Sequence, residues 1–252
     1  MRERAISEVL GYVIIFSMIL LMVGIVYTGG AANLQEVRDN QQVVGVERAF
    51  VAVDSDVTDI ARDGAPSRSS TIRLNGGTLT FGGGATMNVT VGTNTTNSYR
   101  LAPMVYRFDG EPRLAYVGGM VLRSGGDGEW VVVSDPPVVT ARNDTGALES
   151  VLLPVLDTDG TGSAQGARSL TIDTAIDDRQ DIVVGDRQHG DLTVTVNVTD
   201  TPRAGAWGRY FNRTVSTGAG DACEPTGPNG TTCSFETDAF RAAYFPVEVT
   251  LS

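Results

Sequence analysis

The sequence has no lysine and only one histidine, and both absences narrow the functions open to it. All 19 basic residues are arginine, and 30 acidic residues outnumber them, so the formal net charge is −11. A chain this negative lacks the clustered positive charge that binds a phosphate backbone, so we do not expect nucleic acid as a partner. A lone histidine in an acidic, loop-like stretch is typical of the protein surface rather than of a catalytic base.

Motifs for common enzyme chemistry are missing as well. The chain has no Gly-x-Ser-x-Gly elbow, no Walker loop and no His-Glu-x-x-His helix. Asp157 and Asp159, followed by Gly160, are spaced like the first ligands of a calcium loop. Thr161 and the lack of a glutamate at the twelfth position favour an ordinary turn over a calcium site. We therefore predict a protein that is not an enzyme and holds no cofactor or metal.

Cysteine is nearly absent too, since only Cys223 and Cys233 occur. The segment between them is rich in Gly, Pro and Asn, which can turn the chain back on itself, so a disulfide is sterically easy. Such a bridge would stabilise the fold by about 3 kcal/mol in the chain-entropy model. A paired use of cysteine favours an oxidising location outside the cytosol. The alternative is two reduced thiols in an exposed loop.

Charge is absent from residues 9–28, a stretch of about 20 residues that would cover the roughly 30 Å hydrocarbon core of a membrane as a helix. Arg2 and Arg4 precede it and Glu36 is the next charge, which predicts a single-pass membrane protein with a cytoplasmic N-terminus and an extracellular remainder. The alternative is a secretory signal cleaved in the small-residue stretch 30–32.

Residues 4–11, Arg-Ala-Ile-Ser-Glu-Val-Leu-Gly, run from charge directly into the apolar stretch. This start resembles the N-termini of archaeal type IV pilins, and especially the haloarchaeal pattern Ala-Val-Ser-Pro-Val-Ile-Gly, although Glu8 stands where that pattern has proline. The resemblance implies a prepilin peptidase as a partner, cutting between Arg4 and Ala5. It also implies self-association through the retained apolar helix in a filament core.

Glu8 has two interpretations within this resemblance. A carboxylate at the edge of hydrocarbon is costly unless it is paired, and the freed amino terminus of a neighbouring subunit would supply the pairing. Alternatively, Glu8 lies among lipid headgroups near the start of a helix, where the helix dipole favours negative charge. The lysine-free, acidic composition is similar to that of proteins from extremely halophilic archaea, and the whole chain resembles a haloarchaeal group of membrane proteins without an assigned function.

A helical repeat continues beyond the apolar stretch. Apolar residues recur at spacings of three and four: Val43, Val46, Phe50, Val53, Val57 and Ile60. Charged residues, including Asp54, are expected on the other faces, and Gly64 with Pro66 provides a helix stop. The pattern predicts an amphipathic helix that ends near Arg62.

The chain after Ser67 reads as short strands separated by Gly, Pro, Asn and Asp. A hairpin is expected at Asn75 and Gly76, and the clearest alternation of apolar and polar residues covers 192–199. Further strands are expected at 87–91, 104–108, 114–122, 130–133, 151–156, 170–174 and 243–251, and a short helix at 204–211.

Six Asn-x-Ser/Thr sequons indicate N-glycosylation on an extracellular face. They lie at Asn88, Asn94, Asn143, Asn197, Asn212 and Asn229. The number exceeds chance for a chain of this composition, but a threonine-rich β protein also accumulates sequons that are never used. We expect some of the six to be occupied.

These patterns predict an α+β fold, with a long N-terminal transmembrane and amphipathic helix followed by a β-rich, antiparallel, sandwich-like extracellular domain. The expected domains are a leader and transmembrane helix at 1–32, an amphipathic helix at 33–65 and the β-rich domain at 66–252. The expected function is that of a structural or adhesive, pilin-like protein of the cell envelope, and possible filament formation follows from the resemblance. The alternative is a non-polymeric surface module that binds an unknown ligand.

Overall fold

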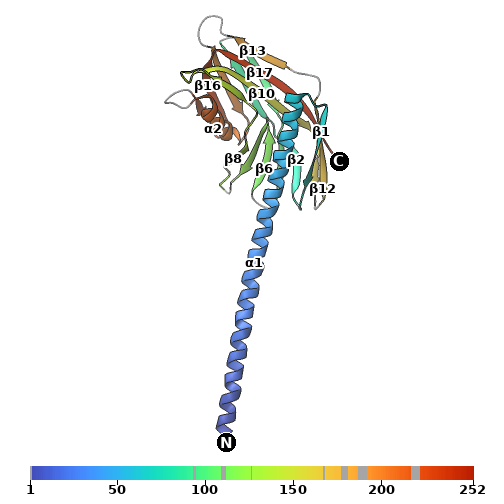
Figure 1. The fold of residues 1–252 in the computed structure, drawn as a ribbon, viewed down its shortest axis with the longest axis vertical. Coiled ribbons are helices and arrows are strands. Elements are labelled where there is room, and N and C mark those ends of the chain that lie inside the picture. Colours follow the sequence, from blue (N-terminus) through green and yellow to red (C-terminus); the bar gives the residue numbers. More distant parts are fainter. Residues whose placement is uncertain are drawn as a thin grey trace. The chain divides into compact units, whose positions relative to one another are not determined.

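The computed structural model describes residues 2–92, 95–108, 112–125, 127–166, 168–176, 181–186, 192–216 and 222–252. The chain divides into two units, Met1–Val44 and Gly45–Ser252. The first unit holds the N-terminal part of helix α1 (Arg2–Asp63). The second holds the remainder of α1, helix α2 (Ala204–Val215) and the strands of three sheets (Figure 1).

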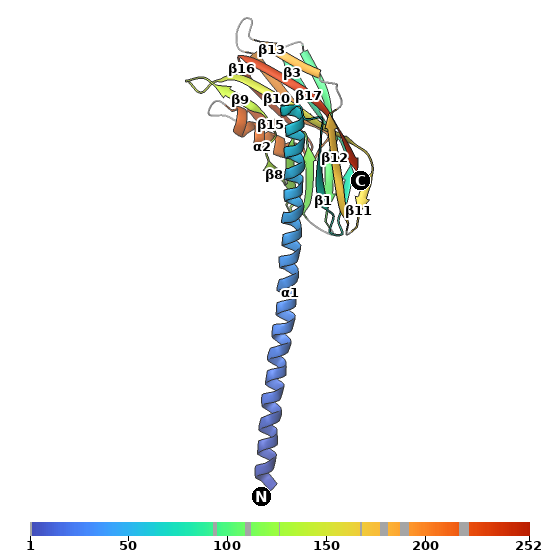
Figure 2. The same cartoon turned by 45° about the vertical axis from the view of Figure 1, so that its right-hand side comes forward.

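Sheet A is built around two long central strands. Its order is β1 (Ser67–Arg73), β12 (Ser169–Ile176), β17 (Ala239–Leu251), β10 (Leu148–Gly160) and β9 (Val139–Arg142), and β13 (Asp181–Asp186) also pairs with β17. On one side of β17, β13 pairs with the first half of the strand and β12 pairs with the second half. Figure 2 shows β1 beside β12 at one edge of the molecule.

Sheets B and C complete the second unit. Sheet B has the order β11 (Ser163–Gln165), β2 (Thr78–Phe81), β5 (Met104–Arg107), β6 (Arg113–Val117), β7 (Met120–Ser124) and β8 (Trp130–Ser134). Sheet C has the order β15 (Cys223–Pro225), β16 (Thr231–Thr237), β14 (Leu192–Thr199), β3 (Ala85–Val91) and β4 (Thr95–Leu101).

The apolar side chains form two cores, and sheet B has apolar residues in both. Val105 of β5 belongs to the first core, with residues of sheet C and α2, whereas its neighbours Met104 and Tyr106 belong to the second. This alternation follows from the period of two residues in a strand. The second core also contains the C-terminal part of α1 and residues of sheet A. Both faces of sheet B are therefore covered.

The predicted fold class is wrong. Strands in three sheets dominate the described residues, so the fold is mainly β rather than α+β. No helix in the described part of the chain is long and apolar enough to cross a membrane.

The helical repeat in the C-terminal part of α1 does mark a buried face. Five of its six members are buried in the second unit: Val46, Phe50, Val53, Val57 and Ile60. Phe50 makes an edge contact with Tyr106 of β5, at 6.5 Å between ring centroids. Glu47, beside this face, pairs with Arg123 of β7 at 3.0 Å. The repeat therefore fixes which side of the helix meets sheet B.

Asp54 departs from the sequence prediction because it is buried rather than on an outer face. Only 7% of its surface is exposed. Its Oδ2 accepts a hydrogen bond from Ser134 at 2.6 Å, whereas its Oδ1 has no partner among the described residues. Burial raises its pKa to about 6, and the Ser134 hydrogen bond opposes only part of that rise. Its charge also adds to the raised pKa of the buried Tyr116.

The turn at Asn75 and Gly76 does not form the predicted hairpin. Both residues have positive φ, as in a tight turn, but the strands on either side, β1 and β2, do not pair with each other. β1 joins sheet A and β2 joins sheet B, because each finds a longer-range partner in β12 or in β5.

The expected single strand at 114–122 is a hairpin of β6 and β7. Gly118 and Gly119 both have positive φ, as the two-residue hairpin turn requires. A Cβ at Gly118 would lie 2.8 Å from the Trp207 ring, and one at Gly119 would lie 2.8 Å from Pro137. Glycine is therefore needed here both for backbone conformation and for space.

Several local predictions are confirmed. β14 occupies the segment with the clearest alternation, and its Val194, Val196 and Val198 are buried. β3 is present where Met87 and Val89 alternate with polar residues. The short helix is α2, which buries Trp207 and Phe211.

The buried Asp54 predicts a distinct pH dependence of stability. Its pKa rises from 3.8 to about 6 on folding, so the folded state holds the proton more tightly. This tighter proton binding contributes about 3 kcal/mol to the free energy of unfolding. The contribution is fully present below the unfolded pKa of 3.8 and is lost as the pH rises through 6. Denaturant unfolding of wild type and Asp54→Asn between pH 4 and 7 should show this loss only in wild type. The exposed Asp63→Asn variant on the same helix is the control. Because it keeps Asp54, it should lose stability with rising pH as wild type does, and a loss in Asp54→Asn as large as in these two proteins would contradict the assignment.

Candidate self-association surface

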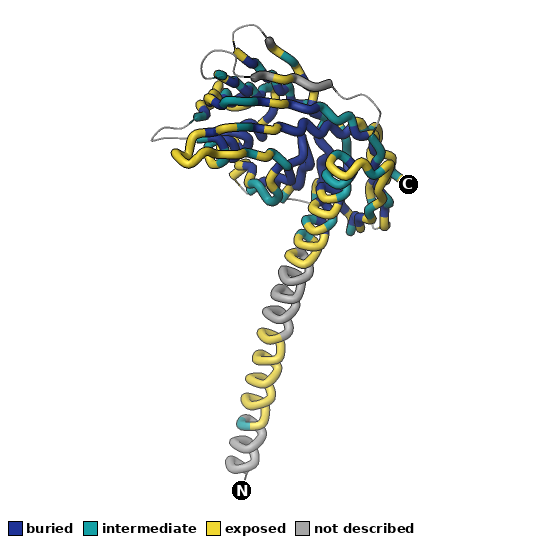
Figure 3. The backbone as a smooth tube through the Cα atoms, turned by 45° about the horizontal axis from the view of Figure 1, so that its top comes forward, coloured by how far each residue is buried: buried dark blue, intermediate teal, exposed yellow. Residues whose placement is uncertain are grey.

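The N-terminal unit presents an unusual apolar surface. Thirteen large apolar side chains between Tyr12 and Val26 have 54 to 80% of their surface exposed. Figure 3 shows this segment of α1 in the colour of exposed residues. Solitary exposed apolar residues are common, but a continuous run of this length marks a surface that is covered by something else.

The run is apolar on every side of the helix rather than along one stripe. It contains no charged residue, and Ser17 donates its hydroxyl to the carbonyl of Val13 at 2.7 Å, so even this polar group bonds to its own helix. A helix that is apolar all round is normally surrounded by other apolar groups. The local sequence supports a helix because Leu, Met and Ile are numerous and proline is absent from 1–62.

The predicted processing and pairing residues lie in the first turns of α1. Arg4 and Ala5 flank the expected cleavage site, and Glu8 is the expected pairing residue. Their backbone is helical, but their side chains lie outside the described ones. The expected cut and the expected pairing therefore stay predictions.

The two cysteines are joined across neighbouring strands. Cys223 of β15 and Cys233 of β16 are register partners with Cα atoms 3.9 Å apart, and they form a disulfide. The backbone N–H of Cys223 donates to Asn212 Oδ1 of α2 at 2.8 Å. The bridge and this hydrogen bond together hold β15 between β16 and α2.

The calcium candidates lie on β10 rather than in a loop. Asp157 is buried and accepts hydrogen bonds from the Ala102 N–H at 2.7 Å and the Tyr244 hydroxyl at 2.8 Å. Burial raises the pKa of Asp157, and these two hydrogen bonds oppose the rise. Both of its oxygens thus fasten the end of β4 and β17 to β10.

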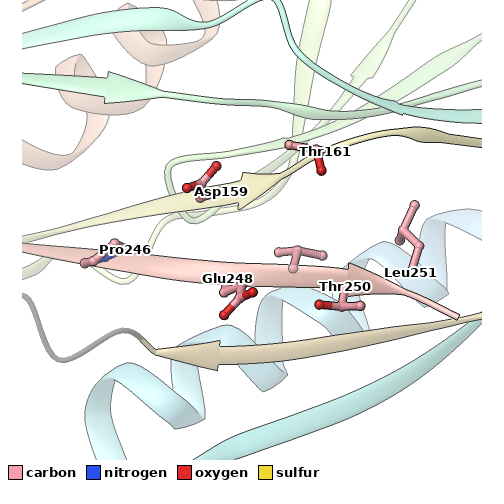
Figure 4. Close-up of a pocket in the computed structure, with 7 residues that line it drawn as sticks. Asp159, Thr161, Pro246, Glu248, Thr250 and Leu251 are labelled. Carbon is pink, nitrogen blue, oxygen red and sulfur yellow. The ribbon is translucent and has the colours of Figure 1, made fainter.

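Asp159 lies two residues further along β10. It lines a pocket with its register partner Glu248 of β17 (Figure 4). No group of three or more potential ligands for a metal ion occurs among the described residues. Of the predicted pair, Asp157 therefore holds strands together, whereas Asp159 lies on an exposed acidic surface.

The six sequons occupy different settings. Asn143 and Asn229 are exposed, while Asn94 lies outside the described residues. Asn212 lies in α2, where its Oδ1 accepts the bond from Cys223. The exposed pair is thus the most accessible to a glycan.

Asn88 and Asn197 are directly opposite each other on β3 and β14. Cβ atoms of such cross-strand partners are about 4.5–5.5 Å apart. The Nδ2 of Asn197, which is the atom that a glycan would modify, donates to Thr232 at 2.7 Å. The two positions are therefore too close for two glycans at once.

Comparison with known families matches residues 4–252 to DUF7289, a family of unknown function. The chain belongs to the DUF7289 family. No curated protein and no solved structure matches it. The site in this DUF7289 member must therefore be interpreted from its own geometry.

The exposure and pairing of the sequons predict which of them carry glycans. Glycopeptide mass spectrometry of the native protein should find Asn143 and Asn229 modified, since both are exposed. It should find no molecule with both Asn88 and Asn197 modified, because these residues are adjacent partners. A molecule carrying glycans at both would contradict the pairing of β3 with β14.

Proposed function

We propose that the protein is a structural subunit that assembles with copies of itself through residues 12–26 of α1, and presents its β unit as an exposed head. The observation that carries this proposal is the uncharged, exposed apolar surface around that segment. The resemblance of residues 4–11 to archaeal type IV pilins favours the same arrangement, in which apolar helices pack together in the core of a filament.

The energetics favour copies of the same helix as the covering partner. Full burial of a large apolar side chain contributes about 1.5–3 kcal/mol. Covering half of the thirteen exposed side chains would offset the roughly 4–15 kcal/mol that association costs. A second copy offers an equally long, equally uncharged surface, so no charge is buried without a partner.

The second unit is suited to the cell surface. The Cys223–Cys233 disulfide is typical of proteins in an oxidising environment. The exposed sequons at Asn143 and Asn229 favour the same location. The net charge of −11 keeps heads in solution apart from one another, which leaves the apolar helix as the contact between subunits.

A charge in the apolar run tests the assembly. Ile19 is 54% exposed, and Ile19→Glu would bury an unpaired carboxylate between helices, at a cost of several kcal/mol. We expect the full-length protein without detergent to form large assemblies by light scattering, and Ile19→Glu to weaken association by about 100-fold or more. Gln41→Glu adds the same charge at an exposed position of α1 and should assemble like wild type.

The outcomes of this experiment separate the two functions considered. Wild type that remains monomeric at all concentrations would contradict the proposal and favour a non-polymeric binding module. Equal loss of assembly in Gln41→Glu would show that charge in general, and not the apolar surface, controls association. Circular dichroism of each variant checks that the helix and the sheets are retained.

Processing at the start of α1 is a separate prediction of this proposal. Cleavage by a prepilin peptidase would leave Ala5 as the first residue and would place Glu8 near the new amino terminus. Mass spectrometry of the native N-terminus should detect Ala5. A start at Met1 or Arg2 would contradict processing, and a start near Asn33 would contradict assembly as well, because the apolar helix would be gone.

A further inference from the structure

A pocket of about 650 Å³ lies in the second unit, between sheet B and the segment that leads into α2. Its lining includes three arginines: Arg107 from the end of β5, Arg113 from the start of β6, and Arg203 just before α2. Gly82 and Gly83 contribute backbone, and Trp130 of β8 forms part of the wall. We call this site the arginine pocket.

Two of the arginines are direct cross-strand partners. Arg107 and Arg113 are paired in the register of β5 and β6, so their side chains leave the same face of sheet B. Like charges directly opposite each other in an antiparallel pair destabilise the sheet. The register therefore brings two positive charges side by side in the lining of the pocket.

Arg203 is the buried member, with 9% of its surface exposed. Its guanidinium lies over the Trp130 ring, 4.7 Å from the centroid, and its Nη1 donates to Thr201 at 3.5 Å. Its Nε has no hydrogen-bond partner among the described residues. Burial, followed by the charges of Arg107 and Arg113, lowers its pKa to about 10.

The described lining of the arginine pocket holds more arginines than carboxylates. Asp200 is the one carboxylate among these described residues, against three arginines. None of the ion pairs between described residues includes Arg107 or Arg203. The first turn of α2, which begins beside Arg203, has no acidic residue to offset the positive end of its helix dipole.

From the unpaired buried Nε of Arg203, the adjacent Arg107 and Arg113, and the excess of arginines over carboxylates in the described lining, we infer that the arginine pocket binds a compact dianion, namely a sulfate or phosphate group. Guanidinium groups match the oxygens of such anions through paired, charge-assisted hydrogen bonds. A long polyanion does not fit this assignment, because the rest of the chain carries a large negative charge that would repel it.

The volume of the pocket indicates that the anion is part of a larger molecule. A volume near 650 Å³ is in the range of small-molecule sites and exceeds what one inorganic anion fills. The additional space, bordered by Phe81 and Trp130, would hold the organic part of a sulfate or phosphate monoester. This inference does not rest on self-association, since every residue that carries it lies in the second unit.

Calorimetric titration of the full-length protein tests the site. The titrants are inorganic sulfate, inorganic phosphate and glucose 6-phosphate, at an ionic strength held constant with chloride. We expect saturable binding of at least one titrant, weakened about tenfold or more by Arg107→Gln through loss of a charge-assisted contact. Arg107 is exposed, so this change should not impair folding. Tighter binding of glucose 6-phosphate than of phosphate would indicate a monoester, and the reverse order an inorganic ion.

A matched variant and a charge-retaining variant complete the experiment. Arg73→Gln removes the same charge from an exposed position of β1 outside the pocket and should bind like wild type. Arg203→Lys keeps the charge but loses the planar fork, and it should weaken binding while the thermal midpoint is checked for folding. Absence of saturable binding, or equal weakening by Arg73→Gln, would overturn the assignment.

Discussion

The parallel pairing of β10 with β17 is the constraint on which the rest of the second unit depends. The register runs from Ser150 opposite Ala239 to Gly160 opposite Val249, in the middle of sheet A. Val155 of β10 belongs to the first core and the next residue, Leu156, to the second. Asp157 then fastens the end of β4 to the same strand through the Ala102 N–H. One strand pair therefore aligns both cores.

Much of the local structure could be predicted from sequence where one face of an element is buried. The repeat from Val46 to Ile60 and the alternation in β14 each identified a buried face, because burial on one side leaves a periodic signal. The parallel pairing could not be predicted, since β10 is buried on both sides and its apolar run has no period. The α+β fold class was wrong because it gave the long N-terminal helix the same weight as the predicted strands, whereas strands in three sheets make up most of the described residues.

The two candidate sites also differ in how far the sequence alone reveals them. The apolar run around Ile19 is contiguous, so the sequence alone marks it as a surface that needs cover. The arginine pocket draws Arg107, Arg113 and Arg203 from segments that only the strand register and the approach to α2 bring together. Asp54 was expected on an outer face because it lies outside the apolar repeat of the helix. Its partner is the hydroxyl of Ser134, which no spacing in the sequence reveals.

The turn between β6 and β7 sets the spacing of two elements that lie far from it in the sequence. Gly118 lies against an indole of α2 and Gly119 against the ring of Pro137, so the tip of one hairpin is the spacer between a helix and the chain that enters β9. A side chain at either position would have to displace the neighbouring ring. The two glycines therefore set how closely α2 and the segment before β9 can approach the hairpin.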